Sequence, residues 1–201
     1  MGGYRGGMLH LASQSPQRAM LLRRAGLRFA VVPSAADEET VRDADPLRLA
    51  LGRARVKAEG ARLPPGASGA VLGADTVVAL GGEEFGKPRD DADALRILRR
   101  LQGTTHQVIT GHHLIRVADG AWAAGAASAA VTMRALSDEE IRAYLATGEH
   151  RGRAGAYALQ ETGDRFVTAL AGSWDAVVGL DLATVSRLHR ELLGGPPPTA
   201  P

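Results

Sequence analysis

Two serines and an arginine lie where a predicted strand (residues 8–12) gives way to a predicted helix (residues 16–25). Ser15 takes the N-cap position and Pro16 the first helical position. Helix N-termini offer unpaired N–H groups and a partial positive charge, so an anion is favoured there. Ser13 adds a second hydroxyl, and Arg18 places a cation in the first turn, where the helix dipole gains nothing from it. The spacing indicates a phosphate site; the alternative is an ordinary capped helix with a solvated arginine.

Asp75 is an acid inside an apolar, β-branched run over residues 71–80 that predicts a buried strand. A buried carboxylate must be paired, bound to a metal or neutral, because uncompensated burial of a charge costs several kcal/mol. The alternative is a strand end at which Asp75 caps the following turn. Since Val77 and Val78 continue the apolar run, we favour a functional carboxylate.

Three further charged residues could complete a site for a phosphorylated ligand. Lys87 lies between Gly86 and Pro88, whose restricted backbone would fix the position of its charge. Glu38 lies in an acidic segment and could bind Mg²⁺, which proteins hold with one or two carboxylates plus substrate phosphates. Lys57 lies in a basic stretch that, taken alone, predicts an exposed helix face. Solvation is the alternative for all three, and we expect Lys87 and Arg18 to lie outside the core.

Other motifs carry less information about function. His112 and His113 are neighbours on a predicted strand and point to opposite faces, which argues against a shared zinc ion. Gln160 follows a strand candidate, and its amide could pair with the edge of a base or make a structural hydrogen bond. P-loop, nucleophile-elbow and HExxH patterns are absent from the sequence.

Composition limits the class of protein. Hydrophobic residues make up 45% of the 201 residues, which is enough for a substantial core. There is no cysteine, and hence no disulfide or thiolate chemistry. We expect a cytoplasmic protein, since no apolar run has the length of a secretory signal or a membrane span. A net charge of +2 and 4% aromatic residues argue against binding of nucleic acid.

Strand and helix signals alternate early, and strands dominate later. The predicted helices cover residues 16–25, 46–61, 90–101, a segment opened by a capping box at 137–140, and 182–193; the strand candidates cover 8–12, 29–33, 71–80, 106–117, 121–133, 156–159 and 166–170. This order predicts an α/β fold with a mixed central β-sheet flanked by helices. We expect a flexible leader over residues 1–7, a single domain over 8–193 and a flexible Pro-rich tail over 194–201.

Taken together, these segments resemble the Maf family of nucleoside triphosphate pyrophosphatases. The matching motifs occur in family order and are LASQSPQR at 11–18, DE at 37–38, GADTVV at 73–78, GKP at 86–88, LQGTTHQVIT at 101–110, AGAYALQ at 154–160 and VVGL at 177–180. Each motif alone is weak evidence for the family, but the whole set in the family's order is specific evidence. The resemblance implies two lobes with a central cleft, and a reaction that converts a nucleoside triphosphate and water to the monophosphate and pyrophosphate.

The resemblance also implies roles for individual residues. It assigns a divalent metal cofactor, Mg²⁺ or Mn²⁺, and the following site: Asp75 as proton acceptor, Glu38 as its acidic partner at the metal, Arg18, Lys57 and Lys87 as triphosphate ligands, and Ser13 and Ser15 at the phosphate loop. Thr76 and Gln160 match the branch that prefers dTTP and UTP. Whether Asp75 accepts the proton of water, holds the metal or does both stays open.

Several alternatives stay open at this stage. One is a pyrophosphatase of the 7-methyl-GTP type, and another is a non-catalytic, nucleotide-binding regulator of cell division. The retained Asp75, Lys87 and Arg18 favour the enzyme, because a binding module does not need the buried carboxylate. We expect a nucleoside triphosphate as the substrate and neither nucleic acid nor a membrane as a partner; a homodimer is compatible with the sequence.

Overall fold

A computed structural model describes residues 7–159 and 162–200, and one mixed sheet runs through them. Its seven strands have the order β2-β1-β3-β5-β6-β7, with β4 paired to β3. They are β1 (Met8–Leu11), β2 (Phe29–Val31), β3 (Gly69–Leu80), β4 (Glu83–Phe85), β5 (Thr105–Arg116), β6 (Trp122–Met133) and β7 (Val167–Gly172). β1 is parallel to both of its neighbours, whereas the other pairs are antiparallel.

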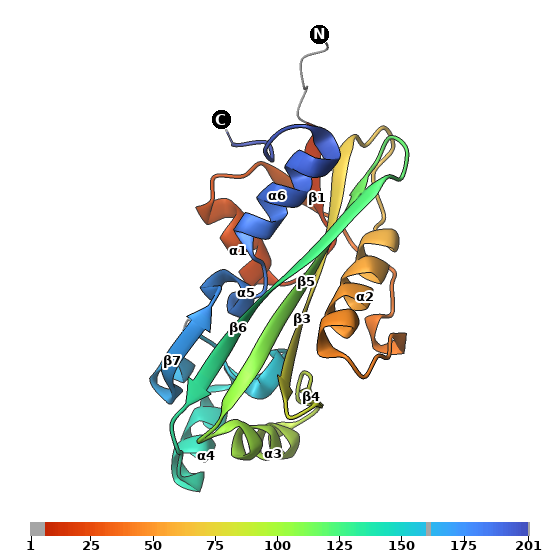
Figure 1. Ribbon diagram of the computed structural model, residues 1–201. Coiled ribbons are helices and arrows are strands. Elements are labelled where there is room, and N and C mark those ends of the chain that lie inside the picture. Colours follow the sequence, from red (N-terminus) through yellow and green to blue (C-terminus); the bar gives the residue numbers. More distant parts are fainter. Residues whose placement is uncertain (1–6, 160–161, 201) are drawn as a thin grey trace.

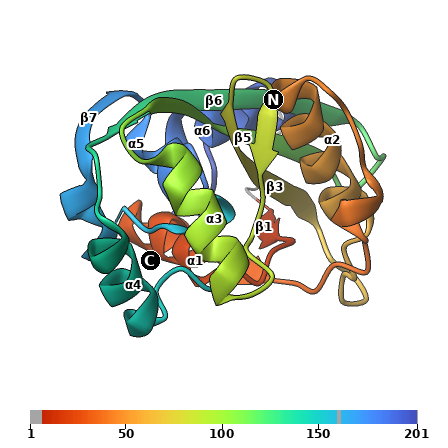
Figure 2. The same cartoon turned by 90° about the horizontal axis from the view of Figure 1, so that it is seen from below.

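Helices cover both faces of this sheet. They are α1 (Pro16–Arg24), α2 (Pro46–Glu59), α3 (Asp91–Leu101), α4 (Asp138–Thr147), α5 (Trp174–Val178) and α6 (Leu182–Leu193). In Figure 1, α2 lies against one side of the long strands, and α5 and α6 lie on the other. Figure 2 views the molecule from the end at which α3 and α4 lie. The predicted mixed α/β fold with flanking helices is confirmed.

Local sequence signals explain where the helices begin. The Asp45 side chain accepts a hydrogen bond from the Leu47 N–H, and Pro46 opens α2. Before α4, Ser137 and Glu140 form the reciprocal capping box that the sequence predicts. The helices and the strands that were correctly predicted differ from their predicted bounds by at most two residues.

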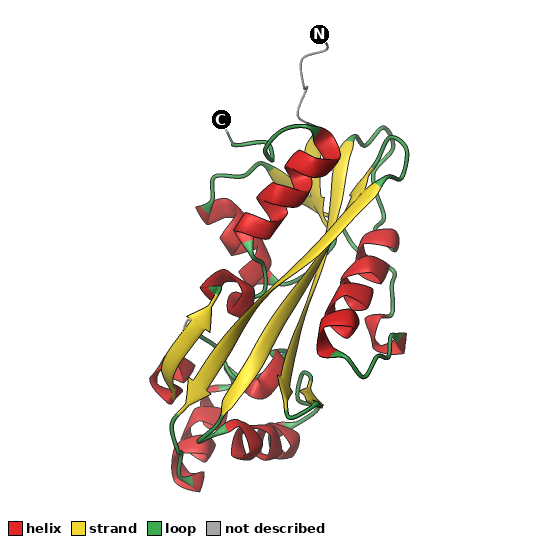
Figure 3. Cartoon of the chain, in the orientation of Figure 1, coloured by secondary structure: helices red, strands yellow, loops and turns green. Residues whose placement is uncertain are grey.

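The two largest of the four apolar clusters among the described residues are joined by the long strands β3, β5 and β6, which Figure 3 shows crossing the length of the molecule. One cluster joins β1, α1 and α6 around Leu9, Leu22 and Leu188. The other joins α3 and α4 around Ile97, Tyr144 and Phe166. β3 is buried along most of its length, which explains its nearly continuous apolar sequence.

The structure corrects one predicted strand and adds elements. Residues 156–159 are not a strand: the segment Ala154–Ala156 is a short 3₁₀ turn in which Gly155 (φ 74°) and Ala156 (φ 60°) are left-handed, and this backbone cannot continue a strand. β4 and α5 were not predicted, because elements of three and five residues carry too little periodicity.

The C-terminal segment, expected as a flexible tail, lies beside the end of α1. The Arg28 N–H donates to the Pro198 carbonyl, and the Ala200 N–H donates to the Gly26 carbonyl. Among the described residues, no helix has the length and apolar character needed to cross a membrane.

Candidate active site

A cavity of about 590 Å³ opens between the two apolar clusters. It adjoins residues 73–77 of β3. These residues lie between the part of β3 that pairs with β1 (Gly69–Leu72) and the part that pairs with β4 (Val78–Leu80). All of the predicted site residues within the described part of the chain line it: Ser13, Ser15, Arg18, Glu38, Lys57, Asp75, Thr76 and Lys87. Gln160, the remaining one, lies outside the described residues.

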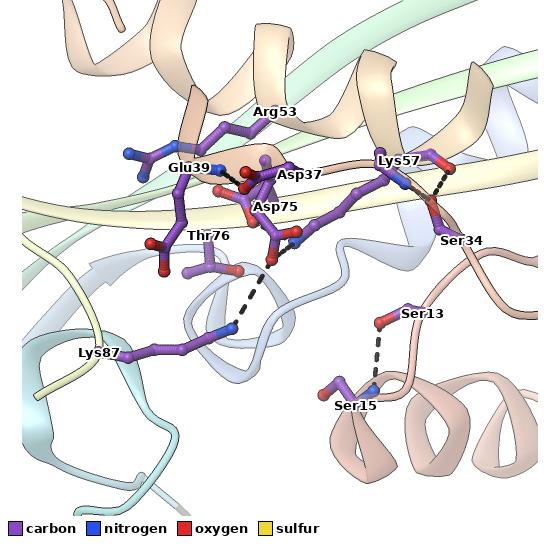
Figure 4. A network of polar contacts seen from close by, with 12 residues as sticks. Ser13, Ser15, Ser34, Asp37, Glu39, Arg53, Lys57, Asp75, Thr76 and Lys87 are labelled. Carbon is purple, nitrogen blue, oxygen red and sulfur yellow. Dashed lines mark hydrogen bonds and ion pairs between the residues drawn. The ribbon is translucent and has the colours of Figure 1, made fainter. Parts of the chain in front are cut away.

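Lys57 joins the two carboxylates of the cavity. Its Nζ donates to Asp75 Oδ1 at 2.6 Å (Figure 4). The same Nζ lies 3.0 Å from Glu38 Oε1. The side chains of Lys57 and Asp75 are only 10% and 11% exposed, so this ion pair is shielded from water. Lys87 approaches the same Glu38 oxygen from the outside, at 3.8 Å, and is 61% exposed. Burial works to raise the pKa of Glu38, but the charge and hydrogen bond of Lys57 outweigh it and leave that pKa lowered.

Two glycines explain why Lys57 reaches Asp75. A Cβ atom on Gly73 would overlap the Ala54 carbonyl of α2, and one on Gly111 would lie 2.5 Å from the Ala50 carbonyl. Because these positions carry no side chain, the backbone of α2 lies directly on the sheet, and Lys57 is buried there. The exposed basic face that the sequence alone predicts is therefore wrong for Lys57. Asp75 follows Gly73 by two residues, so it points to the same face of β3.

Arg18 is buried too, with 8% of its surface exposed, so the expectation that it lies outside the core is wrong. Its acceptors among the described residues are neutral oxygens: Gly179 O at 2.9 Å, Ser13 Oγ at 3.0 Å and Thr76 Oγ1 at 3.3 Å. Burial lowers the pKa of Arg18, and the negative charges of Asp75 and Glu38 oppose that shift. These bonds leave two of the five guanidinium N–H groups for a ligand. A buried cation that meets only neutral acceptors favours an anionic ligand.

The loop before α1 places two hydroxyl groups at the start of the helix. Ser15 is the N-cap residue, but its side chain makes no capping hydrogen bond. Its backbone N–H instead donates to Ser13 Oγ at 3.2 Å (Figure 4). Both hydroxyl groups therefore lie beside the first turn of α1 and line the cavity.

The cavity has a second, largely apolar end that sequence reasoning missed. Val78, Val108, Tyr157, Leu159 and Val177 line it, and all five belong to or pack against one apolar cluster. The Tyr157 hydroxyl lies 2.8 Å from His106 Nε2, and this contact holds the ring in place. A cavity with cations at one end and an apolar wall at the other fits a ligand with a charged and a flat apolar part.

Arg151, Arg153 and Gly179 also line the cavity; no sequence pattern selected the arginines, and Gly179 belongs to the VVGL motif but was assigned no role. The arginines flank Gly152 in a segment whose only visible signal was its charge. The backbone carbonyl of Gly179 accepts a hydrogen bond from Arg18 Nε, and a backbone contact of this kind leaves no signal in the sequence.

Asp75 and Glu38 are better candidates for metal ligands than His112 and His113, whose rings are engaged elsewhere. His112 Nε2 accepts the backbone N–H of Asp181 at 2.9 Å, whereas the His113 ring stacks on Trp122 with 5.1 Å between ring centroids. The described residues contain no group of three or more side chains of the metal-binding types. Asp75 and Glu38, brought together by Lys57, form a pair of oxygen donors that suits a hard divalent cation completed by phosphate and water.

Several known proteins are similar in sequence to this chain. The model of the family described as Maf-like protein matches residues 8–192. A dTTP/UTP pyrophosphatase of Anaeromyxobacter dehalogenans strain 2CP-C is 45% identical over 184 residues, which is 90% of this chain and 92% of the relative. A dTTP/UTP pyrophosphatase of Syntrophotalea carbinolica is 42% identical, over 87% of this chain and 80% of its own. A nucleoside triphosphate pyrophosphatase of Synechococcus sp. strain JA-2-3B'a(2-13) is 40% identical, over 90% and 92%. The chain therefore belongs to the Maf-like protein family.

Proposed function

We propose that this chain is a nucleoside triphosphate pyrophosphatase, which hydrolyses its substrate to the nucleoside monophosphate and pyrophosphate. The observation that carries the proposal is the two-ended cavity. Arg18, Lys57 and Lys87 line it together with the carboxylates, and its other end is apolar. The relatives named above carry the same activity in their names. We further propose that the enzyme acts in the cytoplasm, where nucleoside triphosphates are available as substrates.

The cations of the cavity supply the first requirement of the reaction. Cleavage between the α- and β-phosphates moves negative charge onto the departing pyrophosphate, and fixed cations stabilise that charge. Arg18 is held by three hydrogen bonds and does not need to reorganise during the reaction. Lys87 is more exposed and reaches the cavity from its rim.

Asp75 supplies the second requirement, activation of water. Lys57 donates to Asp75 Oδ1, which leaves the other carboxylate oxygen to accept a proton from water that attacks the α-phosphorus. We propose Mg²⁺ or Mn²⁺ as the cofactor, held by Asp75 and Glu38. Such an ion would lower the pKa of bound water and neutralise phosphate charge.

We further propose a preference for dTTP and UTP, with Thr76 and Gln160 contributing to the choice of base. A glutamine amide can pair with the donor–acceptor edge of a pyrimidine, and a site built for one base leaves polar groups unpaired with another. Gln160→Ala should then reduce the discrimination between bases more than it slows the best substrate. Replacement of Thr76 should have a similar effect.

A panel of triphosphates tests the proposal. The enzyme is assayed for pyrophosphate release from dTTP, UTP, CTP, GTP and 7-methyl-GTP, with Mg²⁺, with Mn²⁺ and with EDTA. We expect turnover with either metal, the fastest rates with dTTP or UTP, and loss of turnover in EDTA. Fastest hydrolysis of 7-methyl-GTP would refute the pyrimidine preference, and binding without turnover would favour a nucleotide-binding regulator.

A further inference from the structure

Two threonine hydroxyls form a short chain behind the cavity. Thr76 on β3 and Thr110 on β5 are directly opposite in the antiparallel register, and their Oγ1 atoms lie 2.9 Å apart. Thr110 Oγ1 in turn lies 2.6 Å from the carbonyl oxygen of Ala176 in α5. Thr110 is fully buried and does not line the cavity, whereas Thr76 does.

The direction of each hydrogen bond follows from the number of protons. A hydroxyl group has one proton to donate and two lone pairs, and a carbonyl oxygen can only accept. Thr110 therefore donates its hydroxyl proton to the carbonyl oxygen of Ala176, and Thr76 donates its own to the hydroxyl oxygen of Thr110. Arg18 Nη2 donates to Thr76 Oγ1 and takes one of its lone pairs. One lone pair of Thr76 remains, so within the described structure Thr76 can accept one hydrogen bond but can donate none.

Ser13, on the other side of the Arg18 guanidinium, has the opposite property. Its Oγ accepts from Arg18 Nη1 at 3.0 Å and from the Ser15 N–H at 3.2 Å, which occupies both lone pairs. No group of the described residues accepts the hydroxyl proton of Ser13, which can therefore donate to a ligand. Figure 4 shows Ser13 on the loop before α1 and Thr76 apart from it, on β3.

This difference divides the cavity chemically. Phosphate oxygens are acceptors, so they suit Ser13 and are repelled by the lone pair of Thr76. A nucleoside carries donors, such as the imide N–H of thymine or uracil and the sugar hydroxyls, and these suit Thr76.

We propose that Thr110 is a positioning residue. By taking the proton of Thr76, it makes Thr76 an acceptor for a donor group of the nucleoside, and thereby sets which end of the substrate lies on each side of Arg18. The inference rests on the proposed function, because it needs a nucleoside triphosphate in the cavity. Thr110→Val should not release Arg18, because Gly179 and Ser13 still hold the guanidinium.

Two probes separate the nucleoside from the phosphates. Binding of α,β-imido-dUTP and of inorganic tripolyphosphate, both with Mg²⁺, is measured by titration calorimetry. For Thr110→Val we expect the nucleotide analogue to bind about 10-fold more weakly, the equivalent of one hydrogen bond, and tripolyphosphate to change less than about twofold. Thr110→Ser keeps the hydroxyl and should bind both probes like the wild type. In turnover of dTTP, the loss in Thr110→Val should lie mainly in KM.

Thr105→Val is the matched control. Thr105 lies on the same strand and pairs with the hydroxyl of Thr132 on β6 at 2.8 Å, but neither residue lines the cavity. The substitution removes the same type of hydrogen bond and should leave both probes unaffected. A double variant, Thr76→Val with Thr110→Val, should lose no more nucleotide affinity than Thr76→Val alone, because the two residues act through one chain.

Unchanged binding of the nucleotide analogue by Thr110→Val, or an equal loss for both probes, would overturn the inference. If Thr110→Val does not fold, Thr76→Val decides: selective loss of the nucleotide analogue supports the assignment, and equal losses refute it. Absence of dTTP and UTP turnover in the wild type would instead refute the proposed function, while the selectivity between the two probes still decides the role of Thr110.

Discussion

Replacing Lys57 by methionine removes the ammonium group that joins two carboxylates, and keeps most of the apolar stem. Asp75, 11% exposed, would lose a partner at 2.6 Å, and Glu38 would lose one at 3.0 Å. Removing one member of a buried ion pair costs about 3–5 kcal/mol, because the other charge is left unpaired away from water. We therefore expect Lys57→Met to be less stable by roughly that amount, and its Tm to fall by about 10 °C for a chain of this size.

The pH dependence of this loss has a definite sign. Lys57 helps to lower the pKa of Glu38 from 4.5 in the folded state, so this carboxylate contributes stability above pH 4.5, and the contribution is lost as the pH falls through the lowered value. Lys57→Met lacks that contribution. The difference in the free energy of unfolding between wild type and variant should thus be largest at pH 7 and become smaller below pH 4.5.

The assay is urea denaturation at pH 7 and at pH 4, with two controls. Lys87→Met removes an exposed lysine 3.8 Å from the same Glu38 oxygen, and an exposed pair of this kind is worth about 0–1 kcal/mol. The double variant Lys57→Met with Asp75→Asn removes both charges and should regain part of the lost stability. A Lys57→Met protein as stable as the wild type, or a double variant no more stable than Lys57→Met, would refute the buried pair.

Three further predictions concern catalysis, binding and pH. Asp75→Asn is nearly isosteric and should lower the rate of pyrophosphate release by about 10²–10⁴-fold with the fold intact; near wild-type rates would make Asp75 structural. Arg18→Ala and Lys87→Ala should each weaken triphosphate use by about 2–5 kcal/mol in kcat/KM, but only Arg18→Ala should also lower the Tm, because only Arg18 is buried. Burial lowers the pKa of both His106 and His112 from 6.5 to about 4. The free energy of unfolding, measured by urea denaturation, should therefore be constant above pH 6.5 and fall between pH 6.5 and 4, by up to about 3 kcal/mol for each histidine. A flat profile between pH 6.5 and 4 would contradict this prediction.

Signals that act within a few residues predicted the fold well. The caps at Asp45 and Ser137 depend on hydrogen bonds between near neighbours, so their residue types identify the helix starts. The apolar run of β3 identifies a buried strand, and the acid inside it identifies Asp75 as a residue that needs a partner.

What could not be predicted depends on distant contacts. The burial of Lys57 requires α2 to lie on Gly73 and Gly111, and no pattern within α2 shows this. Arg18 is buried because the Gly179 carbonyl, 161 residues away, accepts its Nε–H. The left-handed backbone at Ala156 is unusual for a residue with a Cβ, so the apolar residues after it were mistaken for a strand.

The site of attack on the substrate tests the proposed chemistry most directly. Hydrolysis of dTTP in ¹⁸O-labelled water is followed by mass spectrometry of the products, with Asp75→Asn as the matched control. Attack of water at the α-phosphorus predicts one ¹⁸O atom in dTMP and none in pyrophosphate, at a rate that the variant lowers by about 10²–10⁴-fold. Label in pyrophosphate would contradict attack at the α-phosphorus, and products consisting of dTDP and inorganic phosphate would contradict the assignment of this cavity as a pyrophosphatase site.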